Sequence, residues 1–211
     1  MEVVRALQQS LFLFNCPEIY FSAAAQYAQS VPWDQVSKRG NGSNAGRSYI
    51  HPSASLQGVD ELGPLHQWIE ERIEETRVAI GWRDETVRGL RISQSWLNRS
   101  DIGEMHHRHH HPLSILSAIL YITEPATTTF FVPSIYALPR VLAPDKKSGQ
   151  MEVQYDFVAG AAQLVVFPST LKHGVGPNLE PRARITLSVN TWFTGSVGRV
   201  EELAYIGELK S

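Results

Sequence analysis

The sequence predicts a mainly β protein, a barrel or sandwich with N-terminal helices packed outside it. Two observations lead to this prediction: helical patterns occur only before Trp82, and short runs of β-branched and aromatic residues follow. The chain has 211 residues, of which 43% are hydrophobic, enough for a sizeable core. We therefore expect a single domain over residues 1–211.

The charge and composition of the chain indicate which classes of binding partner to expect. The formal net charge is -2, with no basic excess or polybasic tail, so we expect no nucleic acid partner. No run approaches the ~20 apolar residues of a membrane span, so we expect no membrane partner either. Cys16 is the only cysteine, which excludes an intramolecular disulfide and fits a reducing, cytoplasmic location. A homodimer is compatible with the sequence.

The N-terminal part predicts one strand and two helices. The run Leu11–Phe14 is strand-like, and Pro17 can begin a helix that extends from Glu18 to Gln29. The stretch Ser37–Ser53, rich in Gly, Ser, Asn and Arg, predicts an exposed loop.

The second helix is predicted between Pro64 and Ile80, where apolar residues recur in steps of three and four. The opposite side of this helix carries four glutamates, which predict a solvent-exposed face: Glu70, Glu71, Glu74 and Glu75.

The part of the chain after Trp82 predicts strands separated by Gly, Pro, Asn and Asp. The runs are Leu90–Asn98, Ser114–Thr123, Thr127–Val132, Met151–Val158, Ala161–Phe167 and Arg184–Phe193. The stretch Ala137–Gln150, with two prolines, predicts a mobile loop of the kind that often covers a site.

A histidine cluster gives the first indication of chemistry. Five of the eight histidines lie between Glu104 and Pro112. In an extended segment alternate side chains share a face, so His107, His109 and His111 point one way and His106 and His110 the other. An extended His-x-His pair can chelate one metal if a third ligand comes from elsewhere, and we expect a non-haem Fe(II) that activates oxygen.

Three histidines lie outside the cluster. His173 has the best setting, because it follows a buried strand and a proline turn and begins the next strand, which would place it at a barrel mouth. His66 belongs to the helix pattern and is expected at the surface or in packing, and His51 lies in a loop. The sequence therefore predicts a metal site built by His109, His111 and His173.

A candidate anion site lies eleven residues after His173. Arg184, Thr186, Ser188 and Asn190 share one face of the last predicted strand, and the other face is apolar. If the apolar face packs outward, Arg184 points into the barrel, where a guanidinium needs an anion such as a carboxylate. A structural salt bridge is the alternative.

This combination of motifs resembles a known family. The residues that carry the likeness are Ser95–Asn98, His109–Pro112, Ser117, Tyr121, Phe167–Ser169, His173 and Arg184–Asn190. Together they resemble the 2-oxoglutarate- and Fe(II)-dependent oxygenases, and more narrowly a bacterial and phage family related to the prolyl hydroxylases. The likeness implies a double-stranded β-helix, a cupin-like jelly roll, over residues 90–194, with a strand and helices of residues 1–89 packed on it.

The resemblance also implies roles for individual residues. His109 and His173 would be the two histidines of the iron site, and Arg184 would bind the distal carboxylate of 2-oxoglutarate with help from Tyr121 and Ser188. Asn98 would reach the same pocket. The implied reaction is hydroxylation of a small-molecule or peptide substrate, with release of succinate and CO2.

One position departs from the wider superfamily, which usually has Asp or Glu two residues after the first histidine. Here that position is His111; Glu104 is the other candidate for the missing carboxylate. Three other functions stay open: a cupin-like three-histidine dioxygenase that needs no 2-oxoglutarate, a zinc hydrolase, and a non-catalytic metal-binding module.

Overall fold

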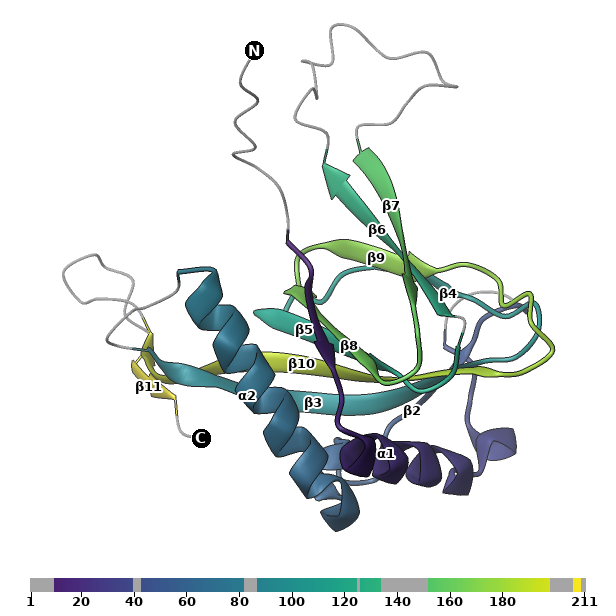
Figure 1. Cartoon of the computed structure of the whole chain (residues 1–211), viewed down its shortest axis with the longest axis horizontal. Helices are drawn as coiled ribbons and strands as arrows, with labels where there is room; N and C mark the ends of the chain where they lie inside the picture. Colours follow the sequence, from purple (N-terminus) through teal and green to yellow (C-terminus); the bar gives the residue numbers. More distant parts are fainter. Residues whose placement is uncertain are drawn as a thin grey trace, which may run out of the picture.

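The computed structural model describes residues 10–39, 43–81, 87–124, 126–133, 152–197 and 207–209. Two antiparallel sheets face each other, and both helices lie outside the larger one (Figure 1). The predicted mainly β architecture with N-terminal helices is thus confirmed. The predicted loop Ala137–Gln150 lies outside the described residues.

The larger sheet has the strand order β1-β8-β5-β10-β3-β2, with β11 paired to β10. Its strands are β1 (Phe12–Asn15), β2 (Arg47–Tyr49), β3 (Val87–Ser100), β5 (Leu116–Tyr121), β8 (Gln163–Pro168), β10 (Arg184–Val197) and β11 (Gly207–Leu209). The smaller sheet, in the order β4-β9-β6-β7, consists of β4 (His106–His109), β6 (Ala126–Pro133), β7 (Glu152–Ala159) and β9 (Lys172–Val175).

The eight strands from β3 to β10 contribute equally to the two sheets, and the chain crosses repeatedly between them. This is the connectivity of a jelly roll, the double-stranded β-helix expected from the resemblance. Each run predicted as a strand is present, with ends shifted by a few residues.

The helices cover the outer face of the larger sheet. They are α1 (Glu18–Ser30) and α2 (Gly63–Ala79), with three short 3-10 turns (Trp33–Gln35, Leu56–Gly58 and Asp60–Leu62) between them. Ile69 and Ile73 of α2 belong to one buried cluster with Leu97 of β3 and Leu187 of β10. Apolar burial against the helices therefore fixes which face of β3 and β10 points outward.

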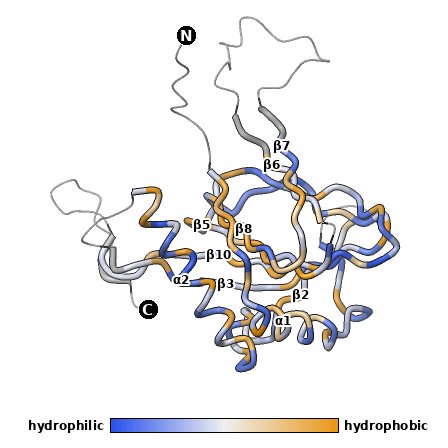
Figure 2. The backbone as a smooth tube through the Cα atoms, viewed as in Figure 1, coloured by the Kyte–Doolittle hydropathy of each residue, from blue (hydrophilic) through white to orange (hydrophobic). Residues whose placement is uncertain are grey.

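A second apolar cluster lies between the two sheets. Tyr121 of β5, Phe130 of β6 and Phe167 of β8 are almost fully buried there. Both faces of β5 and β8 are thus covered, and Figure 2 shows hydrophobic residues running along these two strands. Continuous apolar runs are what strands buried on both sides require.

The stretch Ser37–Ser53 is not simply the exposed loop that its composition predicts. It contains β2, which pairs with β3, and Arg47 of this strand contacts Asp101 at 2.9 Å and Glu104 at 3.1 Å. Partners distant in the sequence therefore stabilise a strand whose own residues are polar.

The glutamate face of α2 is also only partly solvent-exposed. Glu71 and Glu75 are exposed, as predicted, but Glu70 accepts a hydrogen bond from the main-chain N–H of Ile92 at 3.0 Å, and Glu74 accepts one from Leu90. These N–H groups lie on the edge of β3 beyond the reach of β2. The helix thus satisfies donors that an exposed strand edge would leave open.

His66 packs in the core and is not a ligand. Its Nε2 lies 2.9 Å from the Ser95 hydroxyl, its Nδ1 has no partner among the described residues, and burial lowers its pKa from 6.5 to about 4. The native state therefore resists protonation of His66 at a pH where the unfolded chain accepts a proton.

The free energy of unfolding should consequently decrease as the pH is lowered. The contribution of neutral His66 is fully present above pH 6.5 and is lost as the pH falls toward 4, with a magnitude of up to about 3 kcal/mol. His66→Leu should flatten this dependence, which urea unfolding midpoints at neutral pH and at pH ~4.5 would measure. An unchanged dependence in the variant would contradict the assignment.

Candidate metal centre

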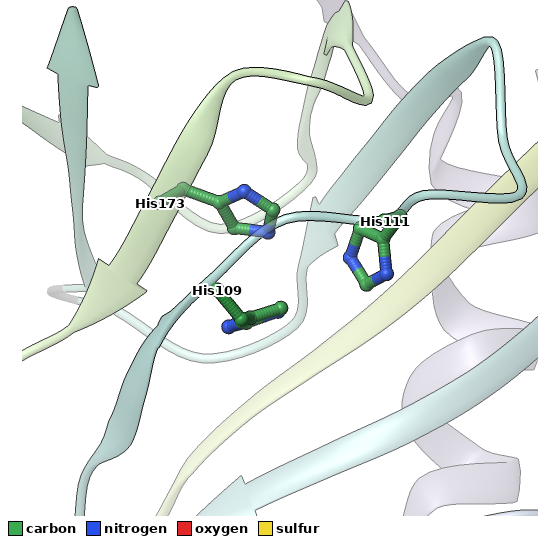
Figure 3. A group of neighbouring side chains, drawn as sticks. All are labelled: His109, His111 and His173. Atoms are coloured by element: carbon green, nitrogen blue, oxygen red, sulfur yellow. The ribbon is translucent and has the colours of Figure 1, made fainter.

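Three histidines, two from neighbouring strands and one from the loop that follows β4, meet at one point (Figure 3). His109 ends β4 and lies directly opposite His173 of β9 in the antiparallel register, and His111 follows two residues later. One nitrogen from each ring lies within 4.8 Å of the others, and the ring centroids of His109 and His173 are 4.4 Å apart. The structure thus brings together the three residues predicted as ligands.

Main-chain carbonyl groups set the tautomers of two of these rings. Nδ1 of His109 lies 2.7 Å from the carbonyl oxygen of His107, and Nδ1 of His173 lies 2.9 Å from that of Leu171. Because a carbonyl only accepts, each Nδ1 must carry the proton. Each Nε2 is then left with a lone pair for a metal, the usual arrangement of a metal-binding histidine.

Burial keeps His111 and His173 in the protonation state that a metal requires. It lowers the pKa of His173 to about 3 and that of His111 to about 4, with a smaller contribution from the neighbouring His109. Both rings are therefore neutral across the physiological pH range, which removes proton competition for the metal.

The position of His111 depends on the turn between β8 and β9. Its main-chain N–H donates to the carbonyl oxygen of Ser169 at 3.0 Å, and its ring contacts Trp96 edge-on. Ser169 is fully buried, and its hydroxyl lies 2.7 Å from that of Ser114 and 2.8 Å from that of Ser117. A chain of buried serines therefore holds the segment that carries the third ligand.

The metal centre opens onto a cavity of about 410 Å³ between the two sheets. The residues predicted to bind 2-oxoglutarate all line it: Asn98, Tyr121, Arg184 and Ser188. The apolar residues Leu187 and Val189 belong to the cluster under the helices, as the alternation of β10 predicts. A volume of this size is typical of small-molecule sites.

The polar groups of the cavity are held in place by one another. The Asn98 amide donates to the hydroxyl of Ser188 at 2.9 Å, and the Tyr121 hydroxyl donates to that of Thr128 at 2.7 Å. The sequence did not predict Thr128 as a site residue, because nothing distinguishes it from the neighbouring threonines, Thr127 and Thr129. It becomes part of the site only through the pairing of β6 with the rest of the smaller sheet.

Arg184 is a cation without an anion. Its guanidinium donates to the carbonyl oxygen of Gly176 at 2.8 Å, and among the described residues no carboxylate forms an ion pair with it. Burial lowers its pKa to about 10, so it remains charged at neutral pH. Within the described part of the chain, the salt-bridge alternative therefore fails, and the group is available for an anion in the cavity.

Glu104 does not provide the missing carboxylate. It is buried outside the cavity lining, where it accepts from Lys38 at 2.9 Å and Arg47 at 3.1 Å. Of the remaining histidines in the cluster, His107 and His110 are exposed and His106 is packed against Gly46.

Comparison with known families agrees with this geometry. Residues 94–190 match a family model described as "Putative 2OG-Fe(II) oxygenase". The resemblance to the 2-oxoglutarate- and Fe(II)-dependent oxygenases is thereby confirmed. No curated protein sequence matches the chain.

Solved structures of this kind share the fold. The α-ketoglutarate-dependent epimerase SnoN from nogalamycin biosynthesis matches with a TM-score of 0.64 at 14% identity, covering 90% of this chain and 82% of SnoN. A prolyl-4-hydroxylase from Pseudomonas putida gives 0.58 at 14%, covering 88% and 92%. HygX from Streptomyces hygroscopicus, solved with nickel and 2-oxoglutarate bound, gives 0.53 at 12%, covering 90% and 87%. At such identities the likeness establishes the double-stranded β-helix.

Removing any one of the three histidines should abolish tight metal binding. We expect His109→Ala, His111→Ala and His173→Ala each to weaken Fe(II) or Co(II) binding by more than about 100-fold in anaerobic calorimetry. His107→Ala is the matched control, because only the main-chain carbonyl of that residue contacts His109. His111→Asp should bind metal better than His111→Ala; full affinity in His111→Ala would remove His111 from the site.

Ser169 should influence the metal through position alone. Ser169→Ala breaks the serine chain, and we expect about 10-fold weaker metal binding and a loss of about 1–3 kcal/mol in unfolding free energy. Ser100→Ala is the control, since the Ser100 hydroxyl is equally buried but has no partner among the described residues. Equal effects in the two variants would show that the chain does not position His111.

Proposed function

We propose that this protein is an Fe(II)- and 2-oxoglutarate-dependent oxygenase whose residues 1–211 form a single domain. The observation that carries the proposal is that a three-histidine cluster and an arginine without an anion open onto one cavity. The donor set fits the metal, because three imidazole nitrogens converge and leave room for further ligands. The cavity fits the keto acid, because it offers a cation and hydroxyl donors at one end.

Each residue has a distinct role in this proposal. His109, His111 and His173 hold the metal, and Arg184 binds the distal carboxylate of 2-oxoglutarate through its planar guanidinium. Burial raises the pKa of Tyr121, so its phenol stays protonated and acts as a donor. By donating to Thr128, Tyr121 leaves the threonine proton free to point into the cavity. Asn98 and Ser188 form the neighbouring polar wall.

Bound Fe(II) would supply the activation of O2, with 2-oxoglutarate oxidised to succinate and CO2 while the substrate gains a hydroxyl group. The protein contributes orientation and exclusion of water. Phe167 stacks edge-on against His173 with centroids 4.8 Å apart, and Trp96 contacts His111 at 5.6 Å. These aromatic rings limit the access of water to the metal ligands.

A second function is favoured by His111 alone. A centre of three neutral histidines suits a cupin-like dioxygenase that binds substrate directly to the metal, with Arg184 holding a substrate carboxylate. The two functions differ in one requirement, because only the first needs a keto acid to consume oxygen.

The setting of the protein follows from simpler observations. No helix in the described part of the chain is long and apolar enough to cross a membrane. We infer a cytoplasmic location from the single cysteine, Cys16, which is buried. The substrate would be a small molecule or a peptide side chain, and a homodimer is compatible with this function.

Arg184→Gln should separate binding of the keto acid from binding of the metal. We expect about 100-fold weaker 2-oxoglutarate binding with unchanged Fe(II) affinity, because a charge-assisted pair is lost and no metal ligand is touched. Anaerobic titration, followed by the metal-to-ligand charge-transfer absorption, measures both. Arg182→Gln, which removes an exposed charge, is the control.

The outcomes that contradict the proposal are specific. Iron binding without a charge-transfer band on addition of 2-oxoglutarate would exclude the keto-acid mechanism. Oxygen consumption that is independent of 2-oxoglutarate, with no succinate formed, would establish the three-histidine dioxygenase instead.

A further inference from the structure

The lining of the cavity has an unbalanced charge. Arg39, Arg108 and Arg184 line it, whereas no aspartate, glutamate or lysine does so in the described part of the chain. Glu104 is close in sequence to the histidine cluster, but its charge is already matched by Lys38 and Arg47. The cavity wall is therefore cationic.

The proposed cofactors do not neutralise this charge. The two charges of Fe(II) and those of the 2-oxoglutarate dianion offset each other, because His111 contributes no negative charge where the superfamily usually has a carboxylate. Arg39 and Arg184, which form no ion pair within the described ranges, remain as an excess of positive charge around the space left for the substrate. Arg184 is half-buried and Arg39 is exposed, and both attract an anion, the exposed arginine most strongly at low salt.

Arg39 lies where that anion would be bound. Its guanidinium has no hydrogen bond or ion pair within the described ranges, in contrast to the neighbouring Lys38, which pairs with Glu104. Arg39 is exposed, so it can reach a ligand without losing a protein partner. The residue before it, Lys38, pairs with Arg47 in an isolated antiparallel β-bridge. This bridge fixes the main chain next to Arg39.

A second hollow adjoins the cavity at the same residue. It has a volume of about 390 Å³ and shares Arg39, Ser48 and Ile50 with the first. Its remaining lining is uncharged: Pro32, Gln35, Val36, Ser37 and Tyr49. Arg39 is thus at the junction between the metal cavity and an uncharged groove over β2.

We propose that the primary substrate is a small molecule with a carboxylate or phosphate group, which Arg39 binds at this junction, and an uncharged aromatic or aliphatic part that lies in the groove. Arg184 stays with 2-oxoglutarate. The inference rests on the proposed function, since it assumes that metal and keto acid occupy the inner end. A guanidinium recognises both carboxylate and phosphate in bidentate fashion, so the two sources share one chemistry.

The experiment uses Zn(II)-loaded protein with 2-oxoglutarate and two matched pairs of probes. The pairs are N-acetyl-phenylalanine with its amide and phenyl phosphate with phenol, and binding is measured by calorimetry and saturation-transfer NMR. We expect each anion to bind at least about 10-fold more tightly than its neutral partner, as a charge-assisted contact implies. The pair with the larger ratio identifies carboxylate or phosphate as the preferred group.

Two variants test whether Arg39 causes the preference for anions. Arg39→Gln should reduce the anion preference to about threefold or less, whereas Arg182→Gln, an equal loss of charge outside the cavity, should leave it unchanged. The inference is overturned if acids and neutral partners bind equally, if Arg39→Gln keeps the preference, or if neither anion binds. Titration of 2-oxoglutarate in the same samples tests the proposed function separately. If the protein does not bind 2-oxoglutarate, the proposed function fails before any probe is added.

Discussion

The two-residue alternation of the strands in the larger sheet is the constraint on which the rest of the molecule depends. Burial of Leu187 against the helices turns Ser188 toward the cavity, and the same alternation makes Leu97 face outward and Asn98 inward. The apolar contact with α2 therefore orients the polar wall of the site. A shift of one residue in register would exchange the two faces and place Arg184 under the helices.

The metal ligands of the smaller sheet are positioned by strand pairing and by a turn, and not by the alternation of one strand. His109 and His173 are distant in sequence, and only the pairing of β4 with β9 places them opposite each other. His111 lies beyond the end of β4 and is positioned by a main-chain hydrogen bond to Ser169. The metal centre thus depends on two strands, which are paired by main-chain bonds, and on a turn, which main-chain bonds and the buried serine hydroxyls hold together.

The sequence predicted those features that repeat with a period or belong to a motif. Helix α2 and strand β10 show their faces in their own residues, and the motif residues predicted the convergence of His109, His111 and His173. Features with partners far away in the chain were missed, because nothing local marks them. Arg47 sits in a stretch typical of a loop and becomes part of a strand through Asp101 and Glu104.

The hydrogen bonds from Ile92 and Leu90 to Glu70 and Glu74 have a consequence for assembly. Donors along a strand edge are the groups through which a second sheet would be added, and here carboxylates of the same chain already occupy them. Another copy of the protein could extend the sheet along this stretch of β3 only by displacing the carboxylates of Glu70 and Glu74 from these donors. The two glutamates of α2 therefore protect this stretch of β3 against edge-to-edge aggregation.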